Sequence, residues 1–231
     1  MRVAYVDMIG GASGNMLLGA FVDAGADFNA IVRTLDSIPV EGWTIACERV
    51  ERRGVSAIYA DVVVPGEDDH RHHPQAHKHP PRKRTLGDVL EIYERSALTA
   101  AQKQTAARVA SRLAEAEGGD RFHPIGQVDA ILDIAATCIA LELLGVGTLF
   151  CSAFPVGRRL PAETAKLLGC APIRQEAIDA EMVTTTGAAI LTTIVETPGV
   201  HPSIQRAREG YGAGRSDFPI PNVTRIEIGD L

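Results

Sequence analysis

The stretch from Gln127 to Gly145 constrains the fold of this chain most strongly, because it is apolar on almost every side. It reads QVDAILDIAATCIALELLG and holds only three charged residues, Asp129, Asp133 and Glu142. A helix that is apolar nearly all round has to be buried on most of its circumference by other elements. The sequence therefore predicts a central helix that ends at Gly145.

Strand and helix patterns alternate along the rest of the chain. The predicted strands cover residues 2–8, 43–50, 55–64, 148–156 and 222–228, and the second and third of these form a hairpin. Helices are predicted from about residue 16 to 24, in a short segment that ends near 35, and over 86–93, 99–117 and 185–196. This order indicates an α/β class, with α+β as the alternative, in which helices pack on a mixed sheet.

Five of the seven histidines fall in the ten-residue string HRHHPQAHKH, and no packed core requires that. The segment 65–84 around it has no hydrophobic period and four prolines, which predicts a disordered, histidine-rich linker. It divides the chain into an N-terminal α/β subdomain with a glycine-rich turn (1–64), the linker (65–84) and a helical and α/β body (85–231).

The histidine string itself predicts a metal site. Neutral imidazole is a good ligand for nickel, copper and zinc, and the string alone does not choose among them. An inert polar loop is the alternative. The candidate metal ligands are His70, His72, His73, His77 and His79.

Composition and charge exclude several classes of partner. The chain has 23 Lys and Arg against 29 Asp and Glu, a net charge of −6, so no broad basic face is expected for nucleic acid. Its apolar runs all meet charges before they reach membrane-spanning length, and no leader pattern precedes residue 2, so we expect a cytoplasmic protein without a membrane partner. The four cysteines lack a C-x-x-C pair and are predicted to be buried free thiols.

The first candidate site is the glycine-rich turn DMIGGASGNM at 7–16, which joins a predicted strand to a helix. Such a turn can present backbone N–H groups and the positive end of a helix dipole to an anion. Ser13 is a candidate helix cap, and Asp7 a candidate to hold a cation or orient a substrate. The alternative is a tight turn in which glycine only supplies a positive φ.

The second candidate site lies in HPIGQVDAILDI, at the start of the central helix. Asp129 and Asp133 are four residues apart and therefore share one helix face, with His123 just upstream. One imidazole and two carboxylates would form a metal site or an acid–base site. Alternatively, Asp129 is solvated and only Asp133 is paired, with Arg112 or Arg121.

Two further segments carry weaker signals. TTTG at 184–187 would present Thr184 and backbone N–H groups at another helix start, and GYGAGR at 210–215 reads as a flexible loop with one cation, Arg215. The alternative for both is a cap and a turn without a ligand.

Taken together and in order, these segments resemble the LarC-type nickel insertion proteins of nickel-pincer cofactor biosynthesis. The similar segments are YVDMIGGASGNMLLGAFVDAG, the histidine-rich insertion, HPIGQVDAILDIAATCIALELLG, VTTTGAAIL and GYGAGRSDFPIPNVTRIEIG. The chain departs from the family's motifs at Gly10, Asn15, Arg121 and Pro124. Residues that match motif positions are Asp7, Ser13, Gly14, His123, Gly126, Asp129, Asp133 and Thr184.

The resemblance implies a lyase-type nickel chelatase that inserts Ni²⁺ into pyridinium-3,5-bisthiocarboxylic acid mononucleotide, consumes CTP and serves lactate racemase. CTP and a divalent cation are expected at the family's C-terminal domain, which we expect to be missing here or supplied by a separate chain. A homo-oligomer is a further expectation.

The leading hypothesis assigns three roles. The histidine string collects Ni²⁺, and His123, Asp129 and Asp133 carry the insertion chemistry. Asp7, Gly11, Ser13, Gly14 and Thr184 bind the substrate and its phosphate. One alternative is a nickel metallochaperone or buffering homologue without chelatase activity, and another is a phosphate-ester binding module with incidental histidines.

Overall fold

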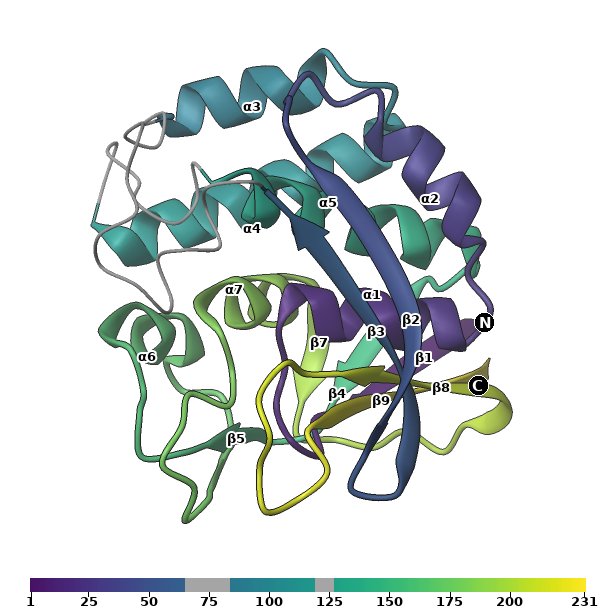
Figure 1. Ribbon diagram of the computed structural model, residues 1–231, viewed down its shortest axis with the longest axis vertical. Coiled ribbons are helices and arrows are strands. Elements are labelled where there is room, and N and C mark those ends of the chain that lie inside the picture. Colours follow the sequence, from purple (N-terminus) through teal and green to yellow (C-terminus); the bar gives the residue numbers. More distant parts are fainter. Residues whose placement is uncertain (65–83, 119–126) are drawn as a thin grey trace.

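A mixed seven-stranded sheet organises the chain. The computed structural model describes residues 1–64, 84–118 and 127–231 (Figure 1). The strands follow the order β2-β3-β8-β9-β1-β4-β7, and a separate small sheet joins β5 and β6. The strand bounds are β1 Arg2–Asp7, β2 Thr44–Arg52, β3 Val55–Val63, β4 Thr148–Cys151, β5 Phe154–Val156, β6 Ile173–Gln175, β7 Val195–Pro198, β8 Gln205–Ala213 and β9 Val223–Asp230.

Parallel and antiparallel pairs alternate in blocks across the large sheet. β1 pairs in parallel with β4, and β4 with β7, while β9 runs antiparallel to both β1 and β8. The β2–β3 hairpin joins the sheet through a parallel contact between Ile58 of β3 and Gly212 of β8. The sheet thus takes strands from both segments, 1–64 and 85–231, that the histidine string separates in the sequence, and the predicted mixed sheet is confirmed.

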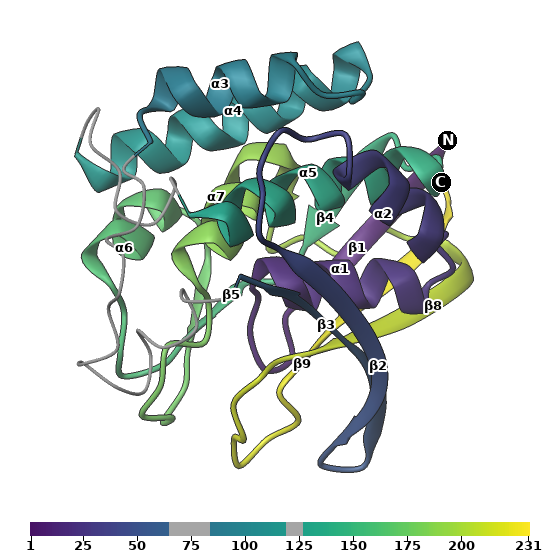
Figure 2. The ribbon, with the colours of Figure 1, turned by 45° about the horizontal axis from the view of Figure 1, so that its top comes forward.

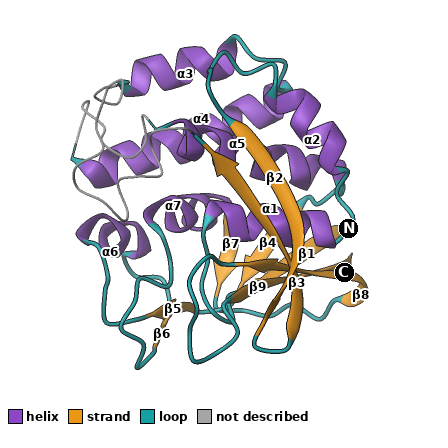
Figure 3. Ribbon diagram, viewed as in Figure 1, coloured by secondary structure: helices purple, strands orange, loops and turns teal. Residues whose placement is uncertain are grey.

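The helices gather on one face of this sheet (Figure 3). Their bounds are α1 Gly14–Asp23, α2 Phe28–Leu35, α3 Leu86–Glu94, α4 Ala100–Glu117, α5 Val128–Leu143, α6 Ala162–Leu168 and α7 Thr185–Ile194. Figure 2 shows α3 and α4 as an outer layer above α5. The hydroxyl of the buried Tyr93 on α3 donates to the carbonyl of Ile131 on α5 over 3.0 Å, which ties the two layers together.

The predicted central helix is confirmed as α5. It packs against α1, α2, α4 and α7, and eleven of its residues are buried. Helix α4 begins and ends where the sequence predicts: Thr99 and Gln102 form a capping box, and Gly118 closes the helix in the left-handed region, at φ 92°. None of the described helices combines the length and apolar character that a bilayer crossing needs.

Three predicted segments differ from the structure in their bounds or type. Residues 148–156 form two strands in different sheets, because the chain turns at Ser152, whose N–H donates to Val6 and whose hydroxyl accepts from Met8. The predicted helix 185–196 ends at Ile194, and its last residues begin β7. Residues 205–213 form strand β8, although the sequence indicates a flexible loop at 210–215.

The cysteines are free, but they are not all buried as predicted. Cys138 and Cys151 are buried, Cys47 is half-buried, and Cys170 is exposed. Cys170 lies just beyond the end of α6.

Candidate functional site

One cavity of about 290 Å³ opens where the N-terminal ends of α1, α5 and α7 meet. Four of the residues that the sequence nominates, Ser13, Asp129, Asp133 and Thr184, lie on its wall although they come from three separate motifs. Its full lining is Ser13, Asn15, Met16, Asp61, Val62, Asp129, Asp133, Glu181, Met182, Thr184, Gly214, Arg215, Ser216, Phe218 and Asn222.

The glycine-rich turn at 7–16 leads directly into α1 and is hydrogen-bonded to the segment that leads into α7. The N–H of Gly10 donates to Val223 and that of Ala12 to Met182, both at about 3 Å, while Ala12 accepts from the N–H of Thr184. Gly11 has a φ of 144°, and a Cβ there would overlap the carbonyl of Met182. Much of the turn's backbone is therefore used to join it to two other loops, and its glycines allow that close approach.

Ser13 and Thr184 cap their helices, as the sequence suggests. The Ser13 hydroxyl accepts from the N–H of Met16 over 3.4 Å, and the Thr184 hydroxyl accepts from the N–H of Gly187 over 3.1 Å. Gly187 packs directly on the backbone of Ala12, where a Cβ would have no room. The two positive helix ends thus lie side by side at the cavity, an arrangement that favours a bound anion.

Asp129 and Asp133 occupy the first two turns of α5 and face the same cavity, as their spacing predicts. Asp129 accepts a hydrogen bond from the N–H of Ala130 over 2.7 Å. Arg112, one of the partners considered for Asp133, donates instead to the carbonyl of Leu167. Within the described ranges, no group of three or more His, Cys, Asp or Glu side chains could hold a metal ion. A metal ion held by this pair would therefore need further ligands.

Some of the nominated residues lie outside the described residues. These are His123, Gly126 and the five histidines of the string, His70, His72, His73, His77 and His79. Their assignment as ligands stays a prediction.

Sequence reasoning missed one charged pair in the cavity wall, between Arg215 and Asp61. A guanidinium nitrogen of Arg215 lies 3.0 Å from the Asp61 carboxylate, and its Nε donates to the Tyr59 hydroxyl over 3.2 Å. The hydrogen bond with Tyr59 is the main reason that the pKa of Arg215 is raised, so this side chain keeps its positive charge. Asp61 lies on β3, and no spacing in the sequence connects it with Arg215.

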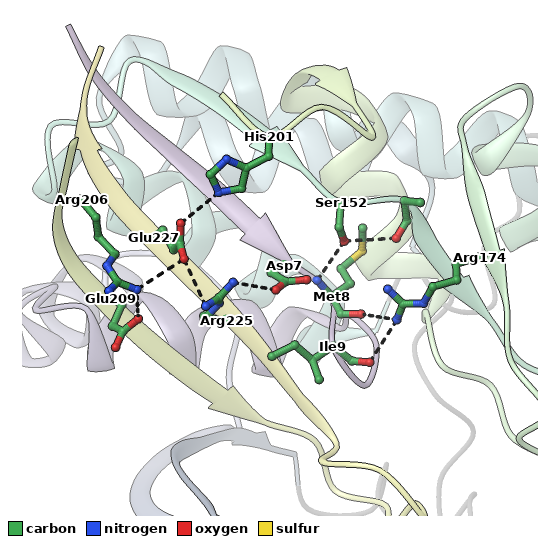
Figure 4. Close-up of polar contacts among 11 residues, drawn as sticks. Asp7, Met8, Ile9, Ser152, Arg174, His201, Arg206, Glu209, Arg225 and Glu227 are labelled. Atoms are coloured by element: carbon green, nitrogen blue, oxygen red, sulfur yellow. Dashed lines mark hydrogen bonds and ion pairs between the residues drawn. The ribbon is translucent and has the colours of Figure 1, made fainter. Parts of the chain in front are cut away.

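Asp7 does not line the cavity. Its carboxylate accepts from Arg225 on β9 over 2.9 Å, and Arg225 also pairs with Glu227 over 3.2 Å (Figure 4). Glu227, whose side chain is only 10% exposed, is shared with His201 and Arg206. Asp7 thus belongs to an ion-pair network across β1 and β9, and Gly11 likewise lies outside the lining.

The same close-up shows how the chain leaves β1. Arg174 donates to the carbonyls of Met8 and Ile9, over 3.3 and 3.2 Å (Figure 4). Its Nε also pairs with the carboxylate of Glu176. The small sheet that carries Arg174 therefore holds the first residues of the glycine-rich turn in place.

Comparison with known proteins identifies relatives along the whole chain. The sequence profile of the family described as "Nickel insertion protein" matches residues 4–230. Two proteins of Desulfitobacterium hafniense, strains DSM 10664 / DCB-2 and Y51, are each 36% identical over 250 residues and are named "Pyridinium-3,5-bisthiocarboxylic acid mononucleotide nickel insertion protein". The match covers 100% of this chain and 59% of each relative, so the chain spans about three fifths of their length. No solved structure gives a significant match. Because the family profile matches nearly the full length of this chain, the chain belongs to the nickel insertion protein family.

Proposed function

We propose that this chain binds Ni²⁺ and delivers it to pyridinium-3,5-bisthiocarboxylic acid mononucleotide in the cavity at the starts of α1, α5 and α7. The observation that carries the proposal is that residues of three distant motifs, Ser13, Asp129 and Thr184, converge on one cavity. The names of the two relatives suggest the identity of the substrate.

The cavity offers two kinds of chemistry to such a substrate. Two helix N-termini and the guanidinium of Arg215 favour an anionic group, and the mononucleotide carries a phosphate. The carboxylates of Asp129 and Asp133 favour a cation. We assign phosphate binding to Ser13, Thr184 and Arg215, and transient metal binding to the two aspartates.

The preference of Ni²⁺ for sulfur ligands over carboxylate oxygens gives the transfer of nickel to the substrate its direction. Carboxylate oxygens suit hard cations and hold a late transition ion weakly compared with sulfur donors. Nickel resting on Asp129 and Asp133 would therefore move readily to the thiocarboxylate sulfurs of a neighbouring substrate. The histidine string would act before this step, as the collecting site.

CTP enters the proposal only through the family resemblance. By that resemblance we expect the CTP site in the family's C-terminal domain, and we assign no residue among 1–231 to CTP or to its divalent cation. Insertion of nickel into the mononucleotide is therefore expected in one of two mixtures. One contains this chain alone, and the other contains this chain together with a second chain that carries such a domain.

The test is to incubate the purified protein with Ni²⁺, CTP, Mg²⁺ and the mononucleotide, and to measure the nickel adduct by mass spectrometry. Adduct formation that falls at least tenfold in Asp129→Asn and Asp133→Asn supports the proposal. The matched control is Asp36→Asn, which changes an exposed carboxylate at the end of α2, away from the cavity.

Two outcomes would overturn the proposal in different ways. Nickel binding without adduct, with or without a C-terminal-domain chain, would identify the metallochaperone alternative. Full adduct formation by both aspartate variants would place the chemistry outside this cavity.

A further inference from the structure

The outer strand of the β2–β3 hairpin has features of an interaction surface. β2 is at the end of the seven-stranded sheet and, among the described elements, pairs only with β3. Figures 1 and 2 both show the tip of this hairpin extending beyond the rest of the sheet. Glu48, Arg49 and Glu51 on this strand are exposed. An exposed edge strand presents unpaired backbone groups to which another strand can add.

The hairpin turn determines which backbone groups face outward. Arg53 and Gly54 form a two-residue turn with positive φ values of 51° and 83°, so Arg52 and Val55 close it as a hydrogen-bonded pair. Hydrogen-bonded and non-bonded pairs alternate in an antiparallel ladder. The N–H and C=O groups of Arg49 and Glu51 therefore point away from β3. A second antiparallel strand has to pair these outward residues with outward residues of its own.

The charges of β2 are complementary to themselves in one such register. The segment Glu48-Arg49-Val50-Glu51-Arg52 can pair with a second copy of itself about Val50. Glu48 then lies opposite Arg52, and Arg49 opposite Glu51, with each pair occurring twice. Opposite charges that face each other across strands stabilise a sheet, and like charges destabilise it.

Neighbouring registers lack this match. Centring the pair on Arg49, Glu48 or Glu51 places that residue opposite its own copy, and the like charges repel. Charges that only protected an edge from aggregation would not need to alternate in this way. The order of the charges therefore specifies both the partner and the register.

Existing contacts hold the two arginines of this segment, Arg49 and Arg52. Arg49 reaches Asp23 over 2.6 Å while its side chain stays 57% exposed, and Arg52 donates to Gly214 and lies over the Tyr59 ring. Glu48 and Glu51 form no ion pair with any described residue. Two arginines held at fixed positions thus alternate with two glutamates that have no charged partner in the part of the chain that the structure describes.

We propose that β2 pairs with β2 of a second copy of this chain, about Val50, to form a homodimer with a continuous sheet. This proposal is independent of the nickel chemistry. Because its ion pairs are exposed, the dimer should weaken as the salt concentration rises.

Sedimentation velocity of the wild-type protein and of variants with exchanged charges on β2 tests the homodimer. The wild-type mass should rise with protein concentration from 24.6 kDa towards twice that value. Glu48→Lys/Glu51→Lys makes the edge uniformly positive and should remain monomeric, as should the uniformly negative Arg49→Glu/Arg52→Glu. An equimolar mixture of the two variants should recover the dimer. Circular dichroism checks folding, chiefly for the second variant, which loses the contacts of Arg49 and Arg52.

The matched control is Glu41→Lys/Glu196→Lys, which changes the net charge equally at two exposed glutamates outside β2 and should dimerise like the wild type. A wild-type protein that stays monomeric at every concentration overturns the proposal. So does a dimer that survives in Glu48→Lys/Glu51→Lys. If both charge-exchanged variants are folded but their mixture stays monomeric, the charges of β2 do not direct pairing and the proposal is overturned.

Discussion

Gly14, the first residue of α1, packs directly against the carboxylate of Asp133 on α5, with no room for a Cβ between them. The two residues come from motifs more than a hundred positions apart, and their contact sets the distance between α1 and α5 at the cavity. Gly14→Ala should therefore displace Asp133 and destabilise the fold by about 1–3 kcal/mol, the typical cost of overpacking. Urea denaturation gives the free energy of unfolding.

The control for this substitution is Gly87→Ala on α3. Among the described residues, a Cβ at Gly87 would meet only the Thr85 hydroxyl, at 3.6 Å, so alanine should stabilise the protein by up to about 1 kcal/mol through its higher helix propensity. Equal free energies of unfolding for the two variants would contradict the close contact of Gly14 with Asp133.

Alkaline pH should destabilise the fold through two buried thiols. Burial raises the pKa of both Cys138 and Cys151 from 9.0 to about 12. Between these values the thiols ionise in the unfolded chain but not in the folded one, so the unfolded state binds fewer protons. The stability that the two protonated thiols contribute is fully present below about pH 9. Above that pH the free energy of unfolding falls by roughly 1.4 kcal/mol per thiol per pH unit.

Denaturation at pH 8 and pH 10 measures this loss. Cys138→Ala/Cys151→Ala should show a smaller difference between the two pH values than wild type, while Cys170→Ser, at an exposed thiol, should retain the full difference. Identical pH dependence in all three proteins would refute the assignment to the buried thiols.

Asp7→Asn should affect stability more than ligand binding. The substitution removes the charge that faces Arg225 on β9, and hydrogen bonds to charged groups contribute about 1.5–3 kcal/mol. Calorimetric affinity for the mononucleotide should stay within about twofold of wild type, a change of only ~0.4 kcal/mol. A tenfold loss of affinity with unchanged stability would instead support the substrate-binding role that the sequence suggests for Asp7.

Arg215→Gln should weaken binding of the mononucleotide about tenfold, because the cavity loses the cation assigned to its phosphate. Arg159→Gln is the control, since Arg159 forms an exposed bidentate pair with Asp179 and does not line the cavity. Isothermal titration calorimetry measures both. Equal affinities for the two variants would remove Arg215 from the proposed site.

Local signals predict much of this fold. The periodicity of 127–145 predicts the central helix, and the capping residue Thr99 and Gly118 mark the ends of α4. The i, i+4 spacing of Asp129 and Asp133 correctly places both on one face, because this depends only on the geometry of a single helix.

Long-range packing accounts for what the sequence does not reveal. Strand β8 resembles a turn because it carries Gly210 and Gly212, yet these glycines let the backbone of α1 approach the sheet. The pairing of Asp61 with Arg215 depends on the adjacency of β3 and β8, which is a property of the sheet order. No local pattern encodes that adjacency.

The most direct test of the central claim is a crystal structure of the protein with the mononucleotide and Ni²⁺, with anomalous data collected at the nickel edge. We expect the mononucleotide in the cavity at the starts of α1, α5 and α7, its phosphate near Arg215 and the nickel peak beside Asp129 and Asp133. A well-ordered mononucleotide bound elsewhere, with this cavity empty, would contradict the account.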